Sequence, residues 1–308
     1  MPSVPDDSAV LVEGPWRHRT ISANGARFHV AEIGDGPLVL LLHGFPQFWW
    51  TWRHQLVGLA GAGFRVVAPD LRGYGASDKP PRGYDGYTLS ADVAGLIRAL
   101  GERDAVIVGH DWGGLLAWSL TAMHPRVVRR LAVLGMPHPL RLRAALLTDP
   151  RGQLRSSSHL FGFQAPAYPE SLIVAEDAAF VGRLLRRWAG PRWQGTADFA
   201  DAERRYRQAM QIPSAAHCSV EYHRWIFRSI TRPSGWRFAK LLQRPVTVPT
   251  LHLHGELDTA LLPRTAMGSG RYVAASYEWH LVRGSGHFVH EEAPDVVTGE
   301  LVRWAKGP

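Results

Sequence analysis

The most informative segment of this 308-residue chain reads Val106-Ile107-Val108-Gly109-His110-Asp111-Trp112-Gly113-Gly114-Leu115-Leu116. An apolar strand enters a helix here through a turn that is crowded with glycine. A nucleophile elbow needs small residues two positions before the nucleophile and two and three positions after it, because the backbones approach too closely for Cβ atoms. Gly109, Gly113 and Gly114 satisfy that spacing and place Asp111 where serine usually stands. Alternatively, Asp111 caps the following helix from an ordinary surface turn.

Strand and helix patterns alternate on both sides of this turn. Short apolar runs bounded by glycine or proline predict buried strands, and apolar residues at helical spacing predict helices. The predicted strands are 27–33, 38–42, 64–68, 105–109, 130–134, 248–255 and 277–282, and the predicted helices are 89–100, 115–123 and 293–304. Such an alternation implies a parallel sheet with helices on both faces, so we predict an α/β protein.

The alternation is interrupted in the second half of the chain. It stops after residue 137 and resumes at Val248, and the segment between is helical in pattern and rich in Trp, Arg and Pro. We therefore predict a helical cap over residues 138–244, inserted between two parts of one core, residues 1–137 and 245–308. The cap should cover one end of the sheet.

Composition excludes several classes of protein. A hydrophobic content of 45% with 20% charged residues allows a large core and excludes a disordered or fibrous chain. The single cysteine, Cys218, excludes an intramolecular disulfide framework and fits a reducing cytoplasm. Residues 1–8 do not resemble a signal peptide, and the apolar run 38–42 is far shorter than the ~20 residues of a membrane span. We expect a soluble, cytoplasmic protein without membrane insertion.

Two later segments supply the partners that a nucleophile at Asp111 needs. The sequence Gly-Ser-Gly-His-Phe at 284–288 puts His287 in a glycine-rich loop after the last strand, where a base can reach the elbow. Glu256 and Asp258 follow another strand and offer a carboxylate that orients His287. The chain order of nucleophile, acid and base is the order of an α/β-hydrolase triad. The sequence His-Gly-Phe-Pro at 43–46 adds a loop whose backbone N–H can join that of Trp112 in an oxyanion hole.

The chain resembles the soluble-type epoxide hydrolases of the α/β-hydrolase fold. The matching motifs are HGFP at 43–46, DLRGYGASDKP at 70–80, GHDWGG at 109–114, the acid turn that ends at Asp258 and GHFVHEEAP at 286–294. They span nearly the whole chain outside the insertion. The resemblance implies the α/β-hydrolase fold, with a mostly parallel eight-stranded sheet, helices on both faces and an inserted helical cap. It also implies an enzyme that converts epoxides to vicinal diols.

The family's site roles carry over by motif. They imply Asp111 as nucleophile, His287 as base, Asp258 as orienting acid in preference to Glu256, and the backbone amides of Phe45 and Trp112 as oxyanion donors. An aspartate suits this chemistry, because a carboxylate that attacks an epoxide carbon forms an alkyl ester, which water activated by a histidine can hydrolyse. Attack on an ordinary ester would give an anhydride, so we do not expect an esterase.

The match departs from the family in the cap. The family donates hydrogen bonds to the epoxide oxygen from two cap tyrosines, and their positions fall here on His159 and His223. Our hypothesis is that these histidines are the donors and that at least one is protonated. Activity should then fall as the pH rises past the imidazole pKa of ~6.5. Alternatively, Tyr222, Tyr168 or Tyr206 donates and the histidines only pack; Tyr222 and His223 should not both face the site, because one helical step turns a side chain by ~100°.

Two other functions stay open. A haloalkane or haloacid dehalogenase of the same fold also uses an aspartate, and the indole N–H of Trp112 could hold a halide. Relatives that act on fluoroacetate, however, have arginines after the nucleophile where this chain has Trp112 and Leu115. A non-catalytic ligand-binding protein of this fold would tolerate loss of Asp111, Asp258 and His287, all of which are present. We therefore expect a neutral, hydrophobic or aryl epoxide, with water as the second substrate.

We expect neither a cofactor nor a metal. The glycines within 58–63 precede a strand, which is the reverse of a dinucleotide-binding turn, and the histidines within 252–254 and 287–290 lack the spacing of a zinc helix. The arginines behind the net charge of +8 are spread along the chain, so we expect no nucleic-acid partner. A homodimer is one possible assembly, and both detoxification and secondary metabolism are open as roles.

Overall fold

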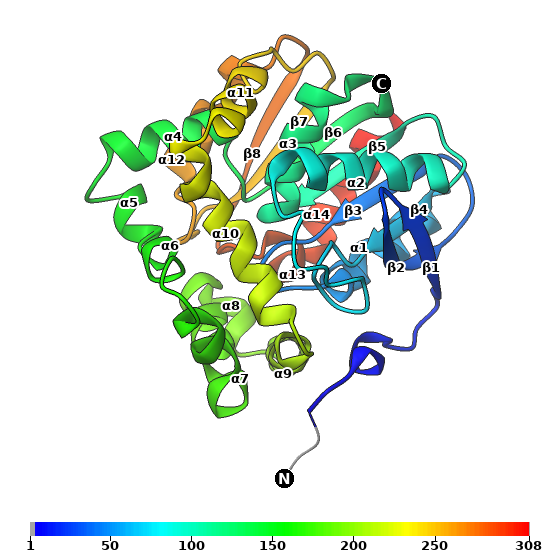
Figure 1. The fold of residues 1–308 in the computed structure, drawn as a ribbon. Coiled ribbons are helices and arrows are strands. Elements are labelled where there is room, and N and C mark those ends of the chain that lie inside the picture. Colours follow the sequence, from blue (N-terminus) through cyan, green and yellow to red (C-terminus); the bar gives the residue numbers. More distant parts are fainter. Residues whose placement is uncertain (1–3, 308) are drawn as a thin grey trace.

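Eight strands form one sheet at the centre of the molecule (Figure 1). The computed structural model describes residues 4–307, so the first three residues of the N-terminal stretch lie outside the described residues. The strands are β1 (Arg17–Ala23), β2 (Ala26–Ile33), β3 (Leu38–Leu42), β4 (Arg65–Pro69), β5 (Ala105–His110), β6 (Val128–Leu134), β7 (Thr250–Gly255) and β8 (Tyr277–Val282). Their order is β1-β2-β4-β3-β5-β6-β7-β8, and only the pairs β1/β2 and β2/β4 are antiparallel. The predicted eight-stranded, mostly parallel sheet is confirmed.

Helices cover both faces of this sheet (Figure 1). The helices α1 (Arg53–Gly61) and α14 (Pro294–Lys306) pack together on one face, and α2 (Gly86–Ala99) and α3 (Trp112–Met123) pack together on the other. α3 is buried over almost its whole length, because it lies between β3, β5 and β6 on one side and α2 on the other. None of the helices within residues 4–307 has both the length and the hydropathy that crossing a bilayer requires.

The sequence patterns miss β1 and α1 of the core, and also the short helices α12 (Pro263–Met267) and α13 (Val289–Glu292). β1 is an edge strand that pairs only with β2, and most of its side chains are exposed, so it lacks the apolar alternation of a half-buried strand. α1 has only nine residues and contains two glycines, Gly58 and Gly61, which weaken its helical pattern. The predicted strands 38–42 and 277–282 coincide with β3 and β8.

Between β6 and β7 the described chain is helical and contains no strand. The helices are α4 (Pro139–Thr148), α5 (Gln153–Ser156), α6 (His159–Gly162), α7 (Tyr168–Trp188), α8 (Pro191–Gln194), α9 (Ala197–Gln211), α10 (Ala215–Thr231) and α11 (Pro233–Leu241). α7 is interrupted at 175–178, where the backbone is not helical. α7 packs on α9, and α10 packs on both. Figure 1 shows this group, coloured green to yellow, beside the sheet. We call it the cap; its division from the core at 138–244 stays a prediction.

A buried ion-pair network joins the cap to the core. Glu291, in the short helix α13 (Val289–Glu292), accepts hydrogen bonds from Arg53 Nη1 and from the Tyr206 hydroxyl of α9, each at 2.6 Å. Arg53 also pairs with Asp198 at the start of α9. Removing one member of such a buried group leaves an uncompensated charge, which typically costs about 3–5 kcal/mol. The cap is therefore fixed to the core by charge as well as by apolar contact.

Candidate active site

The turn at Asp111 has a steric reason for its glycines. Asp111 lies between β5 and α3 with φ 50° and ψ −118°, a region that residues other than glycine rarely adopt. A Cβ on Gly113 would lie 2.1 Å from the Leu42 carbonyl oxygen, and a Cβ on Gly109 would lie 2.3 Å from the Gly113 carbonyl oxygen. Within the described residues the Asp111 side chain makes no capping hydrogen bond to α3, so the interpretation as a helix cap is wrong.

Three side chains from separate loops converge at this turn. His287 Nδ1 lies 2.8 Å from Asp258 Oδ2, and His287 Nε2 lies 3.4 Å from Asp111 Oδ2. His287 and Asp258 are fully buried, whereas the Asp111 side chain keeps 13% of its surface exposed. Asp258 Oδ1 accepts hydrogen bonds from the N–H groups of Ala260 and Leu261, which fixes the plane of its carboxylate. The imidazole is thus held between two carboxylates, one anchored and one partly accessible.

The charges of Asp111, Asp258 and His287 determine one another's protonation. Burial opposes ionisation of Asp111, but the hydrogen bond and charge of His287 outweigh it, so the Asp111 pKa falls well below its usual range. The same imidazole, together with His254, lowers the pKa of Asp258 against its burial. For His287, burial favours the neutral ring, yet Asp258 and Asp111 raise its pKa to about 10. With no substrate bound, the group is therefore a protonated imidazole between two carboxylates.

The structure brings Asp258, and not Glu256, to the imidazole. Glu256 is exposed, and its Oε2 accepts a hydrogen bond from the Gly284 N–H at 2.9 Å. Asp258 also receives a contact that the sequence did not predict, because His254 Nε2 lies 3.3 Å from its Oδ2. His254 lies near the end of β7, four positions before Asp258. The one sequence feature that could have indicated its role is the pair of alternating histidines, His252 and His254, just before the acid turn.

The loop at 43–46 approaches the carboxylate of Asp111. The Phe45 N–H donates to Asp111 Oδ1 at 3.0 Å. A Cβ on Gly44 would lie 2.4 Å from the Asp111 Cβ, so only glycine allows this approach. Trp112 is the first residue of α3, where a backbone N–H has no acceptor within the helix. Two backbone donors therefore lie near the nucleophile position, and one of them already contacts the carboxylate.

Two of the three predicted cap donors have their polar atoms engaged. His223 Nε2 lies 3.0 Å from Trp112 Nε1, and His223 Nδ1 lies 2.9 Å from the Ser219 carbonyl oxygen. Because an indole N–H only donates, Nε2 is the acceptor and Nδ1 carries the proton, so neither nitrogen is left to donate to a substrate. The Tyr222 hydroxyl donates to the Arg72 carbonyl oxygen at 2.7 Å. As the helical geometry predicts, Tyr222 and His223 point to different partners.

His159 has a different environment. Its half-buried ring lies 5.2 Å from that of Trp188, which in turn lies 5.4 Å from the ring of His287. The Ser156 backbone forms a hydrogen bond with the His159 ring, and within residues 4–307 no other protein group does so. The alternative tyrosines are placed elsewhere: Tyr206 donates to Glu291, and the Tyr168 side chain is 61% exposed.

Burial keeps the cap histidines neutral. It lowers the pKa of His159 to about 3, with a further lowering from the neighbouring His223, and it lowers the pKa of His223 to about 4. In the substrate-free protein, burial therefore favours the neutral form of both rings. These pKa directions do not favour a protonated histidine in the cap of the substrate-free protein, and the assignment of a cap histidine as donor stays a prediction.

An apolar cavity of about 220 Å³ lies between the core and the cap. It lies between α3, α4, α10 and α11, and Leu115 and Leu160 are part of its wall. Leu115 follows Asp111 by one helical turn, and Leu160 follows His159 directly. Other side chains in the wall are Leu142, Leu146, Ile226 and Phe238. Asp111, Asp258, His287 and His159 are not part of its wall, so Leu115 and Leu160 are the link between the cavity and the candidate site.

Comparisons with known proteins identify similar α/β hydrolases and epoxide hydrolases. Residues 37–294 match the family model described as alpha/beta hydrolase fold. The chain is 33% identical to epoxide hydrolase 4 from Mus musculus, over 92% of this chain and 77% of that protein. It is 32% identical to the AB hydrolase superfamily protein YfhM from Bacillus subtilis, over 93% and 96%. Among solved structures, an epoxide hydrolase from an endophytic Streptomyces superposes with a TM-score of 0.80 at 29% identity, covering 96% of each chain.

Proposed function

The chain belongs to the α/β-hydrolase fold family and to its epoxide hydrolases, and on that basis we propose that it opens epoxides through a covalent ester on Asp111. In the first step an Asp111 oxygen attacks an epoxide carbon, and the ring C–O bond breaks. The low pKa of Asp111 supports this role, because only the ionised carboxylate is a nucleophile. Phe45 holds Oδ1 at 3.0 Å, which leaves Oδ2 to attack.

Ring opening produces an alkoxide that needs a hydrogen-bond donor and then a proton. We assign the donor to the ring of His159, since His223 and Tyr222 are engaged elsewhere; its N–H then turns from the Ser156 backbone to the alkoxide. Esterification removes the charge of Asp111, so the pKa of His287 falls. The protonated His287 then supplies the proton that the alkoxide takes up, and it becomes neutral.

Hydrolysis of the ester completes the cycle. Neutral His287 takes a proton from water, and the resulting hydroxide attacks the ester carbonyl carbon of Asp111. The carbonyl oxygen is the former Oδ1, so the N–H of Phe45 stabilises its developing charge, and that of Trp112 is the second donor. Collapse releases the diol, restores the Asp111 carboxylate and leaves the proton on His287. The net reaction adds one water to one epoxide, and no proton is lost or gained.

The site favours a hydrophobic or aryl epoxide over the alternative substrates. The apolar cavity beside Leu115 supports an apolar substituent. The indole N–H of Trp112, the group that could hold a halide, instead donates to His223, which does not favour a dehalogenase. A protein that only binds a ligand has no need for the strained backbone at Asp111 or for a charged imidazole between two carboxylates.

We further propose a cytoplasmic location and a homodimer. The buried, free thiol of Cys218 supports a reducing compartment. Fractionation of the source cells tests the location, and size-exclusion chromatography with light scattering tests the assembly. A mass of one chain at micromolar concentration would contradict the homodimer.

The observation that carries the proposed function is the arrangement of Asp111, His287 and Asp258 with the Phe45 N–H. Its test is a single-turnover reaction with styrene oxide in H₂18O, followed by mass analysis of the peptide that contains Asp111. We expect the diol and one 18O atom in the Asp111 carboxylate, because water attacks the ester carbonyl. Diol formation with an unlabelled Asp111 would contradict the covalent ester. If no diol forms, the same assay with haloalkanes decides between a dehalogenase and a protein that only binds.

A further inference from the structure

The loop that carries His287 is attached to the cap through its backbone. The His287 N–H donates to the Trp188 carbonyl oxygen at 2.9 Å. A Cβ on Gly286 would lie 2.4 Å from that same carbonyl oxygen, and a Cβ on Gly190 would lie 2.9 Å from the Gly286 nitrogen. The segments 188–190 and 286–287 are therefore in direct backbone contact, which only their two glycines allow.

One carboxylate bridges this contact. Glu292 Oε2 accepts hydrogen bonds from the N–H groups of Gly190, at 2.8 Å, and Gly286, at 2.6 Å. Its Oε1 accepts from the Phe288 N–H at 3.0 Å. Gly190 belongs to the cap, whereas Gly286 and Phe288 are the two neighbours of His287. Glu292 thus binds the base loop on both sides of the base and binds the cap at the same time.

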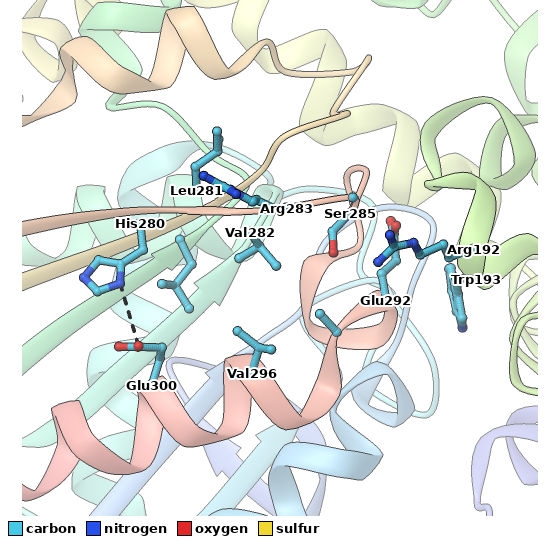
Figure 2. Close-up of a pocket in the computed structure, with 13 residues that line it drawn as sticks. Arg192, Trp193, His280, Leu281, Val282, Arg283, Ser285, Glu292, Val296 and Glu300 are labelled. Carbon is cyan, nitrogen blue, oxygen red and sulfur yellow. Dashed lines mark ion pairs between the residues drawn. The ribbon is translucent and has the colours of Figure 1, made fainter.

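Figure 2 shows the surroundings of this carboxylate. Glu292, at the end of α13, lies beside Arg192 of the cap and Ser285 of the base loop, and all three line a surface pocket of about 340 Å³. Burial raises the pKa of Glu292 to about 7, although the three N–H donors and the nearby His287 lower it. The carboxylate form therefore predominates above neutral pH. Three N–H donors need acceptors, and a carboxylate supplies them on both oxygens.

We propose that Glu292 is a positioning residue for the base: it holds the His287 loop against the cap, and so directs His287 Nε2 toward the ester of Asp111. This inference rests on the proposed function. Nε2 lies 3.4 Å from Asp111 Oδ2, and a shift of the loop would move it away from the water that it must deprotonate. The bond to Asp111 forms before His287 gives its proton to the alkoxide, so ester formation is less sensitive to this loop than ester hydrolysis, in which His287 activates the water.

The test separates the two half-reactions in a Glu292→Gln variant. The amide keeps the size of the side chain but turns one acceptor into a donor that faces an N–H group. Quenched single-turnover reactions with styrene oxide at pH 8.5, analysed by the mass of the Asp111 peptide, follow the formation and decay of the ester. We expect formation within ~3-fold of the wild-type rate and decay slower by ~10-fold or more, since small displacements of reacting groups have effects of this size.

Two variants complete the design. Glu256→Gln removes the carboxylate that accepts from Gly284 in the same loop, and we expect both rates to stay near wild type. Glu292→Asp keeps a carboxylate, and we expect its ester to decay faster than that of Glu292→Gln but more slowly than that of the wild type. If Glu292→Gln does not fold, the comparison of Glu292→Asp with the wild type is the test. An unchanged ratio of formation to decay in the Glu292 variants would show a purely structural role and overturn the inference. If the wild type itself forms no ester, the proposed function fails first, and the inference fails with it.

Discussion

Asp258 is the residue whose replacement best separates the two candidate acids. Its carboxylate raises the pKa of His287 and fixes the ring at Nδ1, so Asp258→Asn should let the ring turn and slow ester hydrolysis. We expect kcat to fall by ~100-fold or more, because an orienting carboxylate has effects of at least this size in other triads. Steady-state assays with styrene oxide measure the loss. Glu256→Gln is the control, and a large loss in that variant together with an active Asp258→Asn would contradict the assignment.

His159 allows a test of the ring-opening donor. Removing its N–H in His159→Phe should slow ester formation by ~10- to 100-fold, because the alkoxide loses a hydrogen bond as it forms. Since the pKa of His159 is lowered to about 3, the wild-type rate of this step should not fall as the pH rises from 6 to 8. Quenched-flow measurements of the ester over that range test the prediction. A fall with a midpoint near 6.5 would instead identify a protonated imidazole.

The helices around the cavity determine which epoxides fit. Leu146 of α4 is partly buried and lines the cavity, so Leu146→Trp should fill much of its 220 Å³. We expect the ratio of kcat/KM for styrene oxide over propylene oxide to fall by ~10-fold or more, because only the aryl substrate needs the space. Val57→Trp, on the exposed side of α1, is the matched control. Equal losses for both substrates would place the aryl group elsewhere.

At the same scale, the elements show what the sequence can predict. β3 and the turn at Asp111 were predicted because their local patterns have local causes: full burial, and a backbone contact that excludes Cβ atoms. The engagement of His223 was not, because it depends on the indole of Trp112, more than a hundred residues away. The contact of Glu292 with Gly190 was not predicted either, because these two residues are also about a hundred positions apart in the sequence. Motifs therefore identified which residues meet, but not which of their hydrogen bonds are already made.

For the whole molecule, buried imidazoles predict the pH range of stability. Burial lowers the pKa of His110 and of His138 to about 3, below the unfolded value of ~6.5, so the unfolded chain binds more protons and stability is lost as the pH falls from 6.5. His287 acts in the opposite direction. Its raised pKa contributes stability that is complete below pH 6.5 and is lost as the pH rises through about 10.

Urea unfolding at pH 5, 7, 8.5 and 10 measures both limbs of this profile. We expect the highest stability near pH 6.5 to 7, and a decrease on the order of 4 kcal/mol by pH 10. In His287→Gln the alkaline decrease should be smaller, while the acid decrease should remain. An alkaline limb that is identical in the two proteins would show that another group causes it.

The network of Glu291, Arg53, Asp198 and Tyr206 has a consequence for recombination between relatives. Two of its members belong to the core and two to α9 of the cap, so neither part carries a complete set of partners. A chimera that exchanges the cap alone would keep the Arg53–Glu291 pair but lose Asp198, the second carboxylate at Arg53, and the Tyr206 hydroxyl that donates to Glu291. A transplanted cap should therefore carry an acidic residue at 198 and a tyrosine at 206, because the core of this protein depends on partners that its own cap supplies.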